Sequence, residues 1–397
     1  MDSLKECGHK KIIFYPPVEW GGLFQRPHHI AFQMAGLFDE ILFVQPAGLR
    51  NPSWKDIGRL RGIIGPARDR LSGQILGHDR LKICWLPFLP FHGLEALEAF
   101  NAWVFSRFVR RSVSSSQATI LWIGAPAPFL RRALRSISPD MLVFDWMDDY
   151  CLFSHLPPVV HDMQYWLVQK ADLVFASSST LLNKARQMRR DGLWLLPNGV
   201  DMAHWDPDKN QGGLARYGSG KSLIGYFGAI SHWLDGDLVS DLAKRHREWD
   251  FVFIGPRTDN GSLDPMFSLS NCHHVSAQPY DKLPTLASGF DVCWIPFKMG
   301  GLMNSINPVK AYEYLAMGKP VVSIPFPDLG GLEHVITFAT DGPSFEKAIT
   351  EALKWGNQPF LADKRRNSVR PFTWERIGRR AATILEDAWE DQHALPL

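Results

Sequence analysis

The chain has 397 residues, too many for one ordinary hydrophobic core and enough for two domains. Apolar residues make up 45% of the sequence, so a large core can be buried. The formal net charge of only +2 gives no overall case for nucleic acid as a partner.

The cysteines and the amino terminus indicate a cytoplasmic protein. Five cysteines lie scattered along the chain, and their odd number favours a reducing compartment over a disulfide scaffold. Residues 1–17 lack the long apolar region of a signal peptide, and no apolar run reaches the roughly 18 residues that a spanning helix needs. We therefore expect a cytoplasmic protein that can still touch the inner face of the plasma membrane.

In the first half of the chain, short apolar runs alternate with amphipathic segments. Residues 26–37 fit a helix with Ile30, Met34 and Leu37 on one face. The apolar runs end in turn residues and are typical of buried parallel strands: 11–17, 40–46, 118–126, 141–148, 171–178 and 193–199. This alternation predicts an α/β fold.

A second series of strands follows residues 198–222, whose Gly, Asp, Asn and Lys are typical of a linker. A helix capped by Thr373 is expected over 373–390. The strands of this half are expected at 223–230, 250–256, 272–278, 290–297 and 320–326. We expect two Rossmann-like domains, 1–205 and 206–375, followed by a helix and tail, 376–397. Ligands of such sheets bind beyond the carboxyl ends of the strands, so the expected site is the cleft between the domains.

Residues 306–322, INPVKAYEYLAMGKPVV, place charged side chains at the start of a short helix. Helix N-termini attract phosphate, because free N–H groups and the dipole point at it. Lys310 in the first turn adds a full positive charge, and Glu313 can accept hydrogen bonds from sugar or ribose hydroxyls. A plain surface pair at i,i+3, worth about 0.2–0.5 kcal/mol, is the alternative explanation.

These residues resemble the nucleotide-sugar domain of GT-B glycosyltransferases near family 4. The resemblance runs through IGYFGAI, FVFIGP, FDVCWIPF and NPVKAYEYLAMGKPVV, and covers most of the chain. With QRPHHIA in the first half, it extends to a bacterial subgroup that assembles polysaccharide and teichuronic acid. It implies the GT-B fold, with a C-terminal helix that crosses back to the N-terminal domain. It also implies that Lys310 contacts the donor diphosphate and Glu313 the ribose or the sugar. The further donor-side candidates are Gly228, His232, Ser305 and Asn307.

The sequence departs from this family in two places. Retaining members usually carry two glutamates eight positions apart, but the residue eight before Glu313 is Ser305. The Arg and Lys that usually follow the first strand of the donor domain are replaced by residues 231–233. Arg257, after FIGP, is a candidate substitute cation. The sugar and the stereochemical outcome, inverting or retaining, stay open.

The segment EWGGLFQRPHH follows the first strand. In the resembling family a glycine pair here lets the backbone approach the donor phosphate or the transferred sugar. Gly21 and Gly22 fit that role, because glycine permits close approach and positive φ; a plain turn is the alternative. Arg26 and His28 begin the next helix and are candidate acceptor-side contacts, or solvated helix residues.

Three carboxylates, Asp145, Asp148 and Asp149, lie at the end of the strand in FDWMDDY. An inverting transferase needs a base for the acceptor hydroxyl proton, and a carboxylate of raised pKa can serve. We expect Asp149 or Asp148 to be that base, with a preference for Asp149. Capping of the local turn by the Asp side chains is the alternative.

Basic residues mixed with aromatic ones suggest contact with an anionic membrane surface. Between Ala99 and Pro139 the chain carries six arginines and no acidic residue, and CWLPFLPFHG lies just upstream. Residues 50–82 add further basic positions. An ordinary basic surface over a helical core is the alternative.

Together these observations predict a glycosyltransferase. It would move a sugar from a nucleotide-diphosphate donor, without a metal or other cofactor, to a glycan acceptor that is lipid-linked, in cell-surface polysaccharide synthesis. Two alternatives remain: transfer to a small soluble acceptor, and a non-catalytic scaffold that binds sugar nucleotides.

Overall fold

The structure is a computed structural model that describes residues 10–21, 24–52, 71–75, 78–113, 118–210, 212–213 and 220–393. The side chains of residues 71–78 and 393 are not among the described features. The chain forms two compact units. Unit 1 comprises residues 1–196 and 377–397, and unit 2 comprises residues 197–376.

Unit 1 is built on a sheet of eight strands in the described part, ordered β3-β4-β2-β1-β5-β6-β7-β8. All neighbouring strands are parallel except β3, which pairs antiparallel with β4 at one edge. The strands are β1 (Lys10–Tyr15), β2 (Glu40–Val44), β3 (Leu71–Ile75), β4 (His78–Cys84), β5 (Ala118–Ile123), β6 (Met141–Trp146), β7 (Leu173–Ala176) and β8 (Leu193–Leu195). The central strands are buried along their whole length, as continuous apolar runs in a parallel sheet require.

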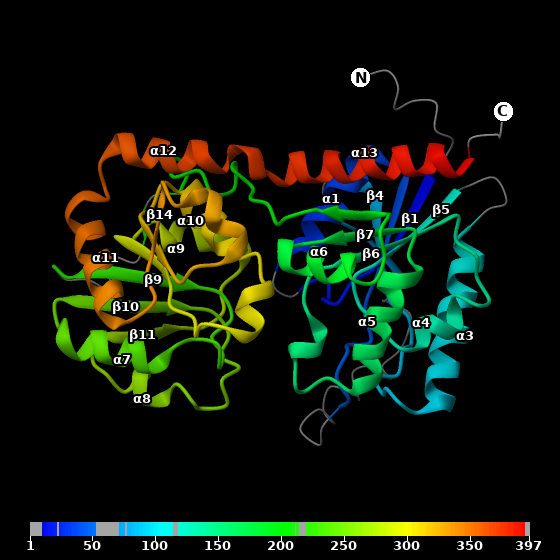
Figure 1. The fold of residues 1–397 in the computed structure, drawn as a ribbon, viewed down its shortest axis with the longest axis horizontal. Helices are drawn as coiled ribbons and strands as arrows, with labels where there is room; N and C mark the ends of the chain where they lie inside the picture. The colour runs from blue at the N-terminus through cyan, green and yellow to red at the C-terminus, as the bar shows by residue number, and fades with distance from the viewer. Residues whose placement is uncertain are drawn as a thin grey trace. The chain divides into compact units, whose positions relative to one another are not determined.

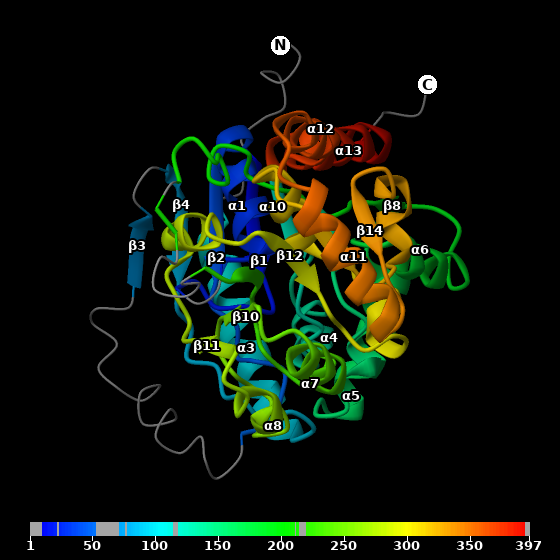
Figure 2. The ribbon, with the colours of Figure 1, turned by 90° about the vertical axis from the view of Figure 1, so that its left-hand side faces the viewer.

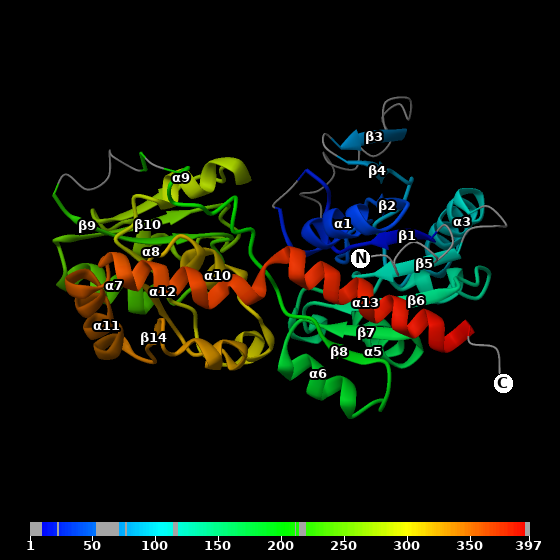
Figure 3. The same ribbon diagram turned by 90° about the horizontal axis from the view of Figure 1, so that it is seen from above.

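The helices of unit 1 cover both faces of this sheet (Figure 3). The first one, α1 (Arg26–Leu37), has the bounds expected from the sequence. Its start is fixed by a capping box between Gln25 and His28 and by Pro27 in the first turn. The others are α3 (Glu95–Ser112), α4 (Phe129–Ala133), α5 (Pro158–Lys170) and α6 (Ser179–Arg186), with a 3₁₀ turn η4 (Tyr150–Leu152).

Unit 2 contains a six-stranded parallel sheet with the order β11-β10-β9-β12-β13-β14. The strands are β9 (Ser222–Phe227), β10 (Trp249–Ile254), β11 (Cys272–Val275), β12 (Val292–Ile295), β13 (Val321–Ser323) and β14 (Ile336–Phe338). This is the strand order of a doubly wound nucleotide-binding sheet, in which the direction of winding reverses beside the first strand, here between β9 and β12. In Figure 2 the structure is turned so that this unit faces the viewer.

The helices of unit 2 lie around this sheet (Figure 1). They are α7 (Gly236–Arg245), α8 (Asp264–Phe267), α9 (Leu283–Ala287), α10 (Val309–Ala316), α11 (Gly342–Trp355) and α12 (Pro359–Val369). Short 3₁₀ turns complete the unit: η5 (Tyr280–Lys282), η6 (Gly301–Ser305), η7 (Pro327–Leu332) and η8 (Arg370–Phe372). The core of each unit consists of buried strand residues with the inner faces of these helices.

The last helix, α13 (Trp374–His393), returns the chain to unit 1. Its start is capped as expected, because the N–H of Arg376 donates to Thr373 Oγ1 over 3.3 Å. Gly378 packs so closely on Gln33 of α1 that a Cβ there would meet its side chain, and Lys10 lies over the Trp389 ring. The expectation of a C-terminal helix that crosses back to the N-terminal domain is therefore confirmed.

Candidate functional site

The loops after β9 and β12 meet where the strand order of unit 2 reverses. Gly228 begins the loop after β9, and the chain leaves β12 through η6 to enter α10. Ligands of doubly wound sheets bind at this point, beyond the carboxyl ends of the strands. The motif that carries Lys310 and Glu313 therefore lies where such a sheet offers a site.

The Lys310 side chain lies against the end of β9, where glycine residues leave room for it. Its Nζ lies 5.5 Å from the centroid of the Tyr226 ring, a cation–π distance. Gly228 has φ +129°, and a Cβ there would lie 2.7 Å from Lys310 Nζ and closer still to Cε. A Cβ on Gly255, after β10, would in turn strike the Gly228 carbonyl. Two glycines thus leave the space in which the ammonium group sits.

Buried amides shape the start of α10. Asn198 Nδ2 donates to the Asn307 carbonyl over 2.7 Å, and Asn307 Nδ2 donates to Tyr312 Oη over 3.1 Å. Ser305 is also buried, and its hydroxyl donates to the Leu302 carbonyl over 2.9 Å. Asn307 and Ser305 therefore fix the loop that leads into the helix. Pro308, the cap residue, supplies no side-chain hydrogen bond to the first N–H groups.

Glu313 is buried, with 7% of its surface exposed. Burial raises its pKa well above the usual range, while the Lys310 ammonium and the Trp205 indole oppose that rise. Burial likewise lowers the pKa of Lys310, and Glu313 opposes the change. A partly buried cation gains more from an arriving anion than a fully solvated one does.

Two other donor-side candidates have partners or surroundings that the sequence did not reveal. The Arg257 guanidinium forms a paired contact with the Asp259 carboxylate and a second ion pair with Asp264. His232 is exposed, and its Nδ1 lies 3.2 Å from Ser231 Oγ. The Arg257 guanidinium is thus already ion-paired with carboxylates close to it in the sequence.

The glycine pair of unit 1 is described only in part. Gly21 is exposed and has φ +100°, a conformation that favours glycine, with no atom within 4 Å of the place a Cβ would take. Gly22 lies outside the described residues.

The two residues expected on the acceptor side are buried. Arg26 Nη2 and Nε both donate to Asp145, at 2.8 and 3.0 Å, and both side chains are 2% exposed. His28 accepts the Gln25 N–H at Nδ1 over 3.0 Å and donates from Nε2 to the Glu19 carbonyl over 3.1 Å. Burial lowers the pKa of His28, in keeping with a neutral ring. Both side chains serve the structure of unit 1, which speaks against direct contact with an acceptor.

The neighbouring carboxylates differ in their surroundings. Asp149 is buried, is ion-paired with Lys184 and accepts the Cys151 N–H over 3.3 Å at the start of η4. Asp148 is only partly buried, and no hydrogen bond or ion pair to it occurs among the described residues. Burial raises its pKa to about 7, with Arg26 opposing and Asp149 adding to the shift. A carboxylate with a pKa near 7 can act as a general base near neutral pH, whereas the Asp149 carboxylate is held in an ion pair with Lys184.

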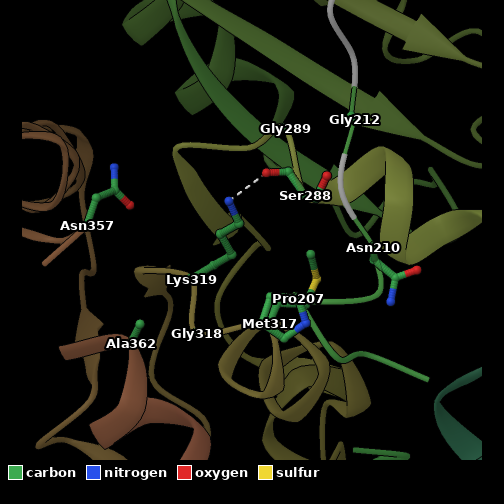
Figure 4. Close-up of a pocket in the computed structure, with 11 residues that line it drawn as sticks. Pro207, Asn210, Gly212, Ser288, Gly289, Met317, Gly318, Lys319, Asn357 and Ala362 are labelled. Atoms are coloured by element: carbon green, nitrogen blue, oxygen red, sulfur yellow. Dashed lines mark hydrogen bonds between the residues drawn. The ribbon is translucent and has the colours of Figure 1, made fainter. Parts of the chain in front are cut away.

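A separate cavity of about 390 Å³ lies at the amino edge of the unit 2 sheet (Figure 4). Gly289 and Lys319 line this cavity and closely precede β12 and β13, at the amino ends of these strands. Lys310 follows β12 and so lies beyond the carboxyl ends of the strands. Lys319 Nζ donates to the Ser288 carbonyl over 2.6 Å, the bond drawn in Figure 4. The Lys319 ammonium group is therefore engaged by the backbone, and the cavity does not belong to the site at Lys310.

No group of three or more His, Cys, Asp or Glu side chains in the described part of the chain is arranged to hold a metal ion. No helix in this part combines the length and the apolar character needed to cross a membrane.

Three residues around Lys310, Gly228 and Glu313 were not among the predicted site residues: Tyr226, Gly255 and Trp205. A signal existed for Gly255, since FIGP repeats the apolar-glycine ending of YFGA one strand earlier. None existed for Trp205, which lies in the expected linker and reaches Glu313 only through the tertiary fold.

Comparison with known proteins gives one curated relative and many structural neighbours. The chain is 24% identical over 231 residues to TuaH of Bacillus subtilis (strain 168), named as a glycosyltransferase of teichuronic acid biosynthesis. The match covers 56% of this chain and 58% of that protein, so it spans little more than half of either. No protein-family model matches.

The solved structures match nearly the whole chain at low sequence identity. Sucrose-phosphate synthase from Thermosynechococcus elongatus has a TM-score of 0.70 at 11% identity, over 96% of this chain and 100% of that chain. Anabaena Alr3699/HepE in complex with UDP and glucose has a TM-score of 0.62 at 15% identity, over 96% and 100%. A UDP-forming trehalose-phosphate synthase from Burkholderia xenovorans has a TM-score of 0.66 at 11% identity, over 96% and 99%. With its two Rossmann-like units and its returning C-terminal helix, the chain has the GT-B fold that the sequence led us to expect.

Proposed function

We propose that the chain is a glycosyltransferase that moves a sugar from a nucleotide-diphosphate donor to a glycan acceptor. One observation carries the proposal: Lys310 lies at the mouth of α10, in a space left by Gly228, where the winding of the unit 2 sheet reverses. A bound diphosphate suits this place, because an ammonium group and the N-terminus of a helix both attract anions.

In the proposed reaction, unit 2 holds the donor. The bond between the sugar and the diphosphate breaks, and negative charge builds on the leaving phosphate oxygen. Lys310 and the start of α10 stabilise that charge, which a preorganised and poorly hydrated site does better than water. Glu313, buried beside Lys310, keeps the ammonium group charged and accepts a hydroxyl of the ribose or the sugar.

For the acceptor, we propose Asp148 as the base in an inverting transfer. Its carboxylate takes the proton of the acceptor hydroxyl, whose oxygen bonds to the sugar carbon as the nucleoside diphosphate departs. A pKa of about 7 lets this group be deprotonated in a useful fraction at neutral pH and still accept a proton. Asp149, which the sequence favoured, is occupied by Lys184 and by the start of η4.

The identity of the substrates is argued from the relatives. HepE was solved with UDP-glucose, and TuaH is named for teichuronic acid biosynthesis, so we propose a UDP-sugar donor and a lipid-linked glycan in cell-surface polysaccharide synthesis. We place the reaction in the cytoplasm, because the four described cysteines are free.

The test is a screen of nucleotide sugars, with UDP-glucose first, for thermal stabilisation and for release of the nucleoside diphosphate. A bound donor raises the unfolding temperature, because it binds only the folded state. Lys310→Ala should abolish both effects, while Lys347→Ala, at an exposed position on α11, should preserve them. Stabilisation without turnover on any glycan acceptor would favour the scaffold alternative. Undiminished turnover in Lys310→Ala would refute the proposed site.

A further inference from the structure

Helix α3 of unit 1 carries aromatic side chains on its solvent-facing side. Phe100 and Trp103 are 38% and 59% exposed, whereas Asn101, Ala102 and Val104 between and beside them are buried. The spacing of three residues puts both rings on one side of the helix. We call Phe100, Trp103, Arg107, Arg110 and Arg111 the α3 face.

Arginines continue this face toward the carboxyl end of the helix. Arg107 and Arg110 follow Trp103 at helical spacing and are exposed, as is Arg111. The Arg107 guanidinium lies 5.8 Å from the centroid of the Trp103 ring, so cation and ring stand together at the surface. The face is thus apolar at its middle and cationic at its end.

The neighbouring helix α4 extends the positive charge. α4 and the turn after it add Arg131, Arg132 and Arg135, all exposed. The Arg110 guanidinium donates to the carbonyl of Ser136 in this turn, which joins the two segments. One of the added charges is offset, because Arg132 pairs with Glu95 over 3.6 Å. No acidic residue occurs from Ala99 to Pro139, so the remaining charge is uncompensated by its own segment.

The rings and arginines together indicate the kind of partner. An acidic protein or a nucleic acid can also meet arginines beside an exposed Trp, but the lipid-linked acceptor of the proposed function lies in a membrane, which favours a lipid surface as the partner. At a lipid surface both features are used: Trp and Phe enter the headgroup region while arginines meet anionic lipid phosphates. The α3 face combines both on one side of a helix.

We propose that the α3 face docks unit 1 on an anionic lipid bilayer. The inference deepens the proposed function, and rests on it, in that a lipid-linked acceptor is presented at such a surface. The docking itself requires neither donor nor turnover.

The test is flotation of the full chain with vesicles of phosphatidylcholine alone and of phosphatidylcholine with phosphatidylglycerol. The protein should float only with the anionic vesicles, and less as salt is added. Phe100→Ser with Trp103→Ser should lower the partition coefficient at least tenfold. Arg107→Gln with Arg111→Gln should lower it roughly 25-fold, because each arginine near an anionic surface contributes about fivefold.

Matched controls lie on unit 2. Trp355 and Phe360, at 56% and 64% exposed, are changed to Ser as the aromatic control. Lys347→Gln with Lys364→Gln is the charge control, since both lysines are exposed. Each control variant should float like the wild type. Equal losses in controls and α3 variants, or equal flotation with neutral vesicles, would overturn the proposal.

Further measurements distinguish membrane docking from donor binding and from nucleic-acid binding. Stabilisation by UDP-glucose should be the same in all these variants, so lost flotation with intact donor binding concerns docking alone. Intact flotation of a wild type that binds no nucleotide sugar would refute the proposed function and leave docking in place. Arginine-dependent binding to duplex RNA without vesicle binding would show the face to be a nucleic-acid surface and refute the lipid proposal.

Discussion

The space that Gly228 leaves for Lys310 can be tested by filling it. In Gly228→Ala the new Cβ would lie 2.7 Å from Lys310 Nζ, whereas ordinary contacts begin near 3.4 Å. The obstructing atoms belong to the far end of a flexible side chain, so the lysine can retreat and the unit can still fold. The ammonium group must then move by roughly 1 Å from its present position.

The expected losses follow from this displacement. A misplacement of roughly 1 Å in a positioning group costs up to about 10²-fold in rate, and we expect a loss of about 10- to 100-fold in kcat/KM for Gly228→Ala. Lys310→Ala removes the cation altogether and should cost about 10²- to 10³-fold. The φ of +129° at Gly228 adds a cost in stability of about 1–3 kcal/mol for alanine.

The decisive assay is a double-mutant cycle on nucleoside diphosphate release. If Gly228 acts only by leaving room for Lys310, the double variant loses no more activity than Lys310→Ala alone. Gly220→Ala is the control for backbone strain, because Gly220 has φ +85° and nothing within 4 Å of a new Cβ. It should be less stable and equally active.

Two results would refute this reasoning. Multiplying losses in the double variant would mean that Gly228 serves the reaction independently of Lys310. Unchanged kcat/KM in Gly228→Ala would mean that the position of the ammonium group is unimportant.

Three further changes probe unit 1 and the loop after β10. Asp148→Asn should remove most turnover, and wild-type kcat/KM should rise with pH around a midpoint near 7; a flat profile would exclude Asp148 as the base. Because the folded pKa is raised, the contribution of Asp148 to stability is present below about pH 4 and is lost as pH rises through 7, so Asp148→Asn should melt at a higher temperature than wild type at about pH 8. Arg26→Met should lower the free energy of unfolding in urea by about 3–5 kcal/mol, because Asp145 stays buried without its partner. Adding Asp145→Asn should restore part of that stability. If Arg26→Met instead kept wild-type stability and raised the KM for the acceptor, Arg26 would be an acceptor-binding residue. Arg257→Gln should change the affinity for UDP, measured by calorimetry, by less than about threefold, since its guanidinium is already paired; a loss comparable to that of Lys310→Ala would make it the substitute cation.

The sequence by itself determined the architecture of this chain. Continuous apolar runs such as KKIIFY and WDFVFI became strands buried on both faces, because only a parallel sheet covered by helices hides such runs. The helix over 26–37 and the short helix that carries Lys310 also follow from local signals, namely Pro in or before the first turn and a left-handed Gly318 after the end.

Only the tertiary structure decided what the polar residues of these elements do. The sequence suggested an accessible Arg26 at the start of a helix, but Arg26 forms a buried ion pair with Asp145, 119 positions away. The adjacent Asp148 and Asp149 are equivalent in sequence, and Lys184, 35 positions on, makes them different. Likewise, helical spacing groups Phe100 with Trp103, but only packing shows that this side of α3 is exposed. Apolar patterns act over a few residues and can be read locally, whereas charge, burial and pKa depend on neighbours that folding brings from far along the chain.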